Sequence, residues 1–91
     1  MISALCFVKV APGKVNQVGE ALAAIPGVRT VYSVTGSVDL VTIIEVPGHE
    51  GVADVVGSFT AAADGIVSTE THVAFRTYRR DDIDAGFSIG A

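Results

Sequence analysis

The sequence predicts an α+β domain with the element order strand, helix, strand, strand, helix, strand. Three observations predict this order. Four short segments are rich in β-branched residues, and their side chains divide between two faces at the two-residue period of a strand. Two longer segments carry apolar residues at helical spacing. Pro-Gly and Asp-Gly pairs separate most of these segments. The order is that of the split βαβ arrangement found in ferredoxin-like folds, with one antiparallel four-stranded sheet.

The first strand is predicted over residues 1–10, and both of its faces contain apolar side chains. One face consists of Ile2, Ala4, Cys6, Val8 and Val10. The other combines Leu5 and Phe7 with polar residues. Pro12 suits the first turn of a helix. That helix is predicted over residues 14–25, with an apolar stripe of Val15, Val18, Leu22 and Ile25.

The next two strands are predicted over residues 28–35 and 38–46, close enough in sequence to form an antiparallel hairpin. A second helix is predicted over residues 50–63, with a stripe of Val52, Val55, Val56 and Phe59 completed by Ala62 or Ala63. The last strand is predicted over residues 66–78. One of its faces carries Val67, Thr69, Thr71, Val73, Phe75 and Thr77, and the other Ser68, Glu70, His72, Ala74, Arg76 and Tyr78.

Two helices can cover only one face of this sheet, and right-handed crossovers place both on the same side. The opposite face would still carry apolar residues from at least three strands. A contiguous apolar patch of that kind predicts dimerisation through this face. Residues 1–79 are predicted to form one domain and residues 80–91 a tail. The tail either frays or docks on a neighbouring subunit, and Ile83, Phe87 and Ile89 favour docking.

Composition narrows the range of functions. The chain has 91 residues, 49% of them hydrophobic and 18% charged, which predicts self-association of so small a core. A net charge of −4 with only six basic residues excludes a clustered basic surface for nucleic acid. No apolar run is long enough for a membrane span, and no signal peptide is evident. The single Cys6, within an apolar run, predicts a core residue and a reducing, cytoplasmic setting.

Catalytic and metal-binding patterns are missing from the sequence. It contains no HExxH, CxxC, GxSxG or P-loop motif, and neither His49 nor His72 has another histidine or a cysteine at ligand spacing. His49 is interpreted as a solvated residue at a helix end. His72 is expected to make a cross-strand hydrogen bond at the dimer interface, in preference to acting as a general base. We therefore expect no catalytic residue, metal or cofactor.

The hairpin turn is the best candidate for a binding site. Gly36 permits a positive φ, which allows the neighbouring amides to point outward and bind an anion. Ser37 adds a hydroxyl group, and Asp39 supplies an acceptor for an ammonium group. Together these groups suit the two ends of an α-amino acid. The same residues also fit a plain hairpin turn in which Asp39 accepts hydrogen bonds from local amides.

The element order, the hairpin segment TGSVDL and the last-strand segment VSTETHVAF resemble the effector-binding domain of the Lrp/AsnC (feast/famine) transcription regulators. The resemblance covers about residues 2–78. It implies sheet-to-sheet dimers, rings such as octamers, and amino-acid effectors bound between dimers near the hairpin turn. The site residues that it implies are Thr35, Gly36, Ser37, Val38, Asp39, Thr69 and Thr71.

Regulators of that family carry a helix-turn-helix domain before this one, whereas residue 1 here begins the first strand. The resemblance therefore implies a stand-alone effector domain that acts through assembly, or through co-assembly with full-length regulators, without contacting DNA. Two alternatives stay open. One is a small dimeric α+β barrel enzyme, such as a monooxygenase or isomerase, with His72 or Tyr32 in a pocket between helices and sheet. The other is a purely structural oligomer that binds no ligand.

Overall fold

The computed structural model describes residues 1–81, and its elements follow the predicted order. They are β1 (Ile2–Val10), α1 (Val15–Ala23), β2 (Val28–Ser33), β3 (Leu40–Val46), α2 (His49–Gly57), α3 (Phe59–Ala62) and β4 (Ile66–Val73). The predicted tail lies outside the described residues except for its first two positions. Within residues 1–81, no helix has the length and apolar character needed to cross a membrane.

The four strands form one antiparallel sheet in the order β2-β3-β1-β4, which confirms the ferredoxin-like α+β fold. The strand β1 is central and pairs with both β3 and β4. Phe7 lies opposite Val41 on β3 and opposite Glu70 on β4, so these three side chains share one face of the sheet. The register with β4 shifts between Lys9 and Val10, at the end of β1.

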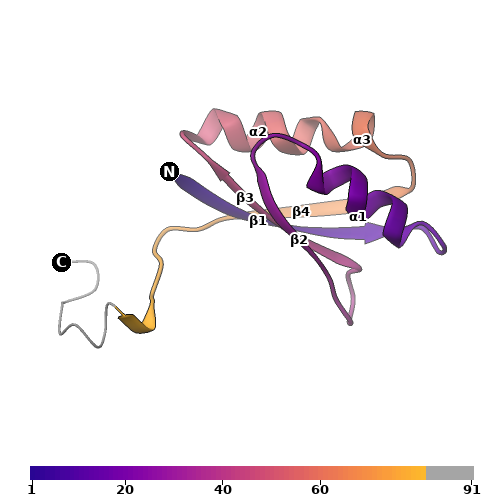
Figure 1. Ribbon diagram of the computed structural model, residues 1–91, viewed down its shortest axis with the longest axis horizontal. Helices are drawn as coiled ribbons and strands as arrows, with labels where there is room; N and C mark the ends of the chain where they lie inside the picture. The colour runs from indigo at the N-terminus through magenta and orange to yellow at the C-terminus, as the bar shows by residue number, and fades with distance from the viewer. Residues whose placement is uncertain (82–91) are drawn as a thin grey trace.

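All three helices lie on one side of the sheet, as Figure 1 shows. The core forms between them and the alternate residues of β1 and β3 that face the same way. Its buried members are Ala4, Cys6, Val8, Val10, Leu40, Thr42, Ile44 and Val46 from the strands, with Val18, Leu22, Val52, Val55 and Phe59 from the helices. The predicted alternation of β1 and β3 and the predicted apolar stripes of both helices are therefore confirmed.

The other side of the sheet carries no helix in the described chain, and we call it the open face. Its apolar residues are Leu5, Phe7, Tyr32, Val41 and Ile43, which share this side by their register. The side chain of Tyr32 is 56% exposed, and the other four are partly buried by their neighbours within the sheet. The apolar surface that the sequence predicts on this face is present.

The first helix and the two hairpin strands end or begin two residues inside their predicted bounds, and two other elements differ more. The second helix is divided at Ser58, whose hydroxyl donates a hydrogen bond to the Val55 carbonyl at 2.7 Å and competes with the helical pattern. The last strand ends at Val73 and does not continue to residue 78. The partner strand β1 begins at Ile2, and the Ala74 amide already bonds to the carbonyl of Ser3, so almost no strand remains for β4 to pair with beyond this point. Phe75, beyond the strand, is fully exposed.

Candidate effector site

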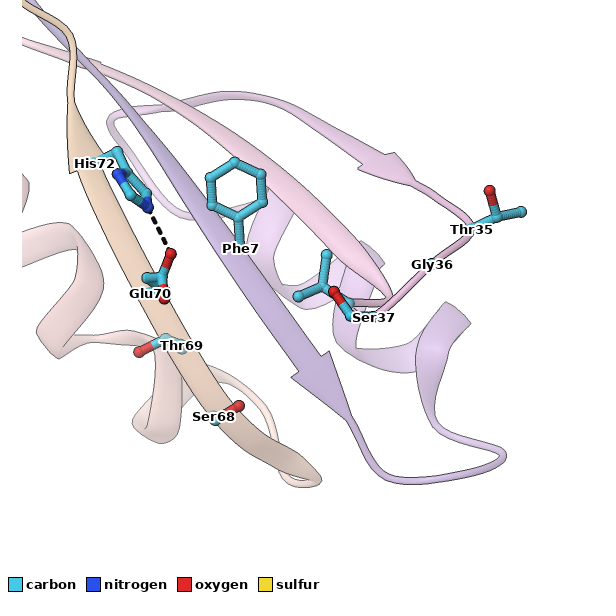
Figure 2. Close-up of a pocket in the computed structure, with 9 residues that line it drawn as sticks. Phe7, Thr35, Gly36, Ser37, Ser68, Thr69, Glu70 and His72 are labelled. Carbon is cyan, nitrogen blue, oxygen red and sulfur yellow. Dashed lines mark hydrogen bonds and ion pairs between the residues drawn. The ribbon is translucent and has the colours of Figure 1, made fainter.

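A hollow of about 650 Å³ opens between the hairpin turn and β4. Its lining residues are Phe7, Thr35, Gly36, Ser37, Val38, Ser68, Thr69, Glu70 and His72. In Figure 2, Phe7 stands on β1 between the turn on one side and Glu70 and His72 on the other. Three separate parts of the chain thus meet at the hollow, and its volume lies in the range of small-molecule sites.

The turn side of the hollow depends on Gly36. Its φ of +112° is unfavourable for residues with a Cβ, and a Cβ built there would meet no atom within 4 Å. Glycine is therefore required by the backbone conformation and not by a lack of space. The next residue, Ser37, presents its carbonyl oxygen to the Nζ of Lys9 at 3.5 Å. A positive charge consequently lies beside the turn.

The opposite side of the hollow is formed by β4. The Nε2 atom of His72 lies 2.6 Å from Oε2 of Glu70, two residues earlier on the same strand. The imidazole ring also packs edge-on against Phe7, with ring centroids 5.4 Å apart and an interplanar angle of 85°. Within the described chain the partner of His72 is thus Glu70, which alternation places on the same face of β4, and the expected cross-strand bond at a dimer interface stays a prediction.

Asp39 does not line the hollow. Its Oδ2 accepts a hydrogen bond from the backbone N–H of Val10 at 2.8 Å, and its own amide donates to the Val8 carbonyl at 3.0 Å. Its carbonyl accepts a bond from the amide of Val34 at 3.0 Å. The carboxylate therefore joins the hairpin to the end of β1, where the register with β4 shifts and Val10 needs an acceptor.

Thr71 also lies away from the hollow. Its hydroxyl donates a hydrogen bond to Sγ of Cys6 at 3.4 Å on the side of the sheet that faces the helices. Burial raises the pKa of the Cys6 thiol, and the bond from Thr71 opposes this rise in part. Cys6 is fully buried and unpaired, which confirms its interpretation as a core residue.

The hollow therefore brings together Thr35, Gly36, Ser37, Val38 and Thr69 of the seven residues expected at the site. Four further residues line the hollow and were not expected there: Phe7, Ser68, Glu70 and His72. The sequence did predict that Ser68, Glu70 and His72 share one face of the last strand, because they alternate along it. What could not be seen is that this face of β4 lies across β1 from the hairpin turn.

The enzyme alternative is not supported by this arrangement. His72 and Tyr32 both lie on the open face, and the buried core occupies most of the space between helices and sheet. A smaller hollow of about 260 Å³ between α1 and the strands β2 and β3 contains neither residue. Neither side chain can line a pocket under the helices. Among residues 1–81, no group of three or more His, Cys, Asp or Glu side chains is arranged to hold a metal ion.

The fold and the hollow define a ferredoxin-like domain with a ligand-sized site at its hairpin turn. The family model of the Lrp/AsnC ligand binding domain matches residues 3–83, nearly the whole sequence. The chain belongs to this family, which is a family of non-enzymatic regulatory domains. A search of curated proteins finds no match.

Small solved proteins share the fold over their full length. TTHA0845 from Thermus thermophilus is 40% identical with a TM-score of 0.80, and the match covers 88% of this chain and all of that one. FFRP-DM1 is 28% identical with a TM-score of 0.74, covering 82% of this chain and all of its own. A transcriptional regulator from Neisseria meningitidis, solved with L-Met, shares the fold at 11% identity and a TM-score of 0.73, over 87% of this chain and 53% of that one.

Proposed function

We propose that this chain is an oligomeric binding module that holds an amino acid or a similar small effector in the hollow beside the hairpin turn. The observation that carries the proposal is that four consecutive turn residues, 35–38, line a hollow of about 650 Å³ in a domain of a ligand-binding family. The L-Met bound to the Neisseria meningitidis regulator supports an amino acid as the class of ligand.

The chemistry of the hollow supports the same class. A positive charge at Lys9 and the outward amides that Gly36 permits favour a carboxylate at the turn. The hydroxyls of Thr35, Ser37 and Ser68 add donors and acceptors, and Phe7 offers an apolar surface. Asp39 is the weaker candidate for an ammonium partner, because Oδ2 already accepts the Val10 amide.

The proposal includes dimerisation through the open face. Four apolar side chains on three strands, Leu5, Tyr32, Val41 and Ile43, lie outside the hollow and have no covering helix in the described chain. A second copy would bury them, and this additional burial would stabilise a domain whose own core is small. A bound effector would then shift assembly, or co-assembly with full-length regulators, only by its differential affinity for the assembled state.

The docking of the tail on a neighbouring subunit belongs to the same proposal. Support comes from the segment that leads to the tail, where Phe75 is fully exposed and Tyr78 is 65% exposed. Figure 1 shows this segment leaving the body of the domain. Exposed aromatic rings at such a position favour an intersubunit contact.

Thermal unfolding with a full panel of amino acids at millimolar concentration tests ligand binding. A ligand that binds the folded state raises the melting temperature with its concentration. We expect a rise for at least one amino acid and its loss in Ser37→Ala with Ser68→Ala, two exposed residues that line the hollow. If no amino acid moves the melting temperature, the chain is a structural oligomer without an effector.

A further inference from the structure

We infer that Glu70, and not Asp39, binds the α-ammonium group of the effector, while Lys9 and the hairpin turn bind its α-carboxylate. The inference rests on the proposed function and adds to it the residues that recognise the part common to all amino acids. It starts from the acids near the hollow. Glu70 is the only acidic side chain among the described residues that line it, whereas Asp39 does not line it and accepts the Val10 amide.

Lys9 and Glu70 lie close together on the open face of the sheet. The register places Lys9 opposite Ser68 on β4. Glu70 follows Ser68 by two positions on the same face of that strand, so Lys9 and Glu70 are diagonal neighbours. The Cβ atoms of diagonal neighbours are about 7 Å apart, a separation that long side chains can bridge. One small molecule can therefore contact both residues.

These two opposite charges do not pair with each other among residues 1–81. The Nζ atom of Lys9 lies 3.5 Å from the Ser37 carbonyl oxygen, and Oε2 of Glu70 lies 2.6 Å from Nε2 of His72. The turn that Lys9 contacts and the Glu70 carboxylate lie on opposite sides of Phe7 (Figure 2), with the hollow between them. The Glu70 side chain is 75% exposed, and its Oε1 is available to a ligand.

An α-amino acid fits between these charges. Its carboxylate and ammonium groups share one carbon atom, and each would add a charge-assisted hydrogen bond of about 2.8 Å to its partner. The carboxylate would meet Lys9 and the amides that Gly36 permits to point outward, and the ammonium group would meet Oε1 of Glu70. The ligand's own side chain takes no part in these contacts. The arrangement therefore selects free α-amino acids over acids that lack the ammonium group.

Isothermal titration calorimetry with amino acids and their α-hydroxy analogues tests the role of Glu70. The probes are the L-amino acids that raise the melting temperature, each with the α-hydroxy acid of the same side chain, such as α-hydroxyisocaproate for leucine. We expect the unaltered protein to bind the amino acid at least about tenfold more tightly, the size expected for a hydrogen bond to a charged group. Glu70→Gln should remove this preference by weakening the amino acid alone. Asp39→Asn, which keeps an acceptor for the Val10 amide, is the matched control and should retain the preference.

Lys9→Gln tests the other end of the ligand. Both probes carry a carboxylate, so this substitution should weaken the amino acid and the α-hydroxy acid by similar factors and leave the preference between them intact. Lys9 and Glu70 are exposed, and circular dichroism should show an unchanged fold in both variants. Unchanged affinities in Lys9→Gln would overturn the role of Lys9.

The outcomes separate the inference from the proposed function. Equal affinities for the two probes in the unaltered protein, a preference that survives in Glu70→Gln, or one that is lost in Asp39→Asn would overturn the role of Glu70 while an amino acid still binds. If no amino acid of the panel binds, the proposed function fails, and the inference fails with it.

Discussion

The carboxylate of Asp39 accepts a hydrogen bond from the backbone N–H of Val10 at 2.8 Å, across 29 positions of the sequence. This bond joins the hairpin to the end of the central strand at the point where the register with β4 shifts. It gives Asp39 a role in stability that does not depend on any ligand. The two roles considered for this residue can therefore be separated by substitution.

Asp39→Ala removes the acceptor and leaves the partly buried Val10 amide without a partner. We expect a loss of about 1–3 kcal/mol in the free energy of unfolding, measured by urea denaturation at fixed protein concentration. Asp39→Asn keeps an acceptor oxygen and should retain most of the stability. If the Asn variant is as unstable as the Ala variant, the Val10 bond is not the main contribution of this side chain.

Gly36→Ala is expected to lower the free energy of unfolding by roughly 1–2 kcal/mol, because φ of +112° is unfavourable for alanine even though its Cβ has space. Gly57→Ala is the matched control. Gly57 also has open space around its Cα, but it ends α2 without a positive φ. Its substitution should leave stability unchanged or slightly higher. Equal losses in both variants would contradict the conformational argument.

Thr42 is fully buried, and its Oγ1 has no hydrogen-bond partner among the described residues. Thr42→Val replaces this hydroxyl with a methyl group and should raise the free energy of unfolding by about 1 kcal/mol. Thr42→Ser keeps the hydroxyl, loses a methyl group and should lower it. Chemical denaturation of both variants measures the difference, and a destabilised Val variant would indicate a partner for the hydroxyl.

Ile43→Lys places a charge on the open face without altering the hollow or the core. If two copies pack through this face, sedimentation velocity should show a shift from dimer to a 9.3 kDa monomer at micromolar concentration, with circular dichroism unchanged. Gln17→Lys, at an exposed position of α1, is the control and should remain dimeric. An unaltered protein that sediments as a stable monomer would exclude the interface.

Cys6 predicts a pH dependence of stability. Burial raises the pKa of its thiol above the ordinary value of 9.0, so the unfolded chain ionises first as the pH rises. Its contribution to stability is complete below pH 9.0 and is lost as the pH rises toward the folded-state pKa. Stability should therefore fall more steeply from pH 7 to about pH 10 in the unaltered protein than in Cys6→Ala. Parallel curves would contradict the prediction.

The fold was predictable because the spacing of apolar residues and the positions of the turn-forming Gly and Pro residues indicate the same elements. The alternation of β1 placed Cys6 and Val8 in the core, and the alternation of β3 placed Thr42 there with its apolar neighbours. The length of β4 was not predictable in the same way. Alternation continues past Val73, but pairing stops where β1 begins, and the length of a partner strand is not visible in the strand itself.

The site was only partly predictable, for a similar reason. The turn residues 35–38 are local, and Gly36 marked them. The partners that complete the hollow, Phe7 and Glu70, depend on which strands are neighbours. The bond between the Asp39 carboxylate and the Val10 amide could not be predicted, because it joins two segments that are far apart in the sequence. Without that bond in view, a ligand was the alternative partner for the carboxylate.

The central place of β1 has a consequence during synthesis. Among the described elements the ribosome makes this strand first, yet the structure pairs it with β3 and with β4, which comes last of them. Both of its sides are apolar, and closing such long loops slows folding. The nascent chain must therefore carry an unpaired, aggregation-prone strand until nearly all of the domain has emerged, which makes molecular chaperones and low expression temperatures important for its yield.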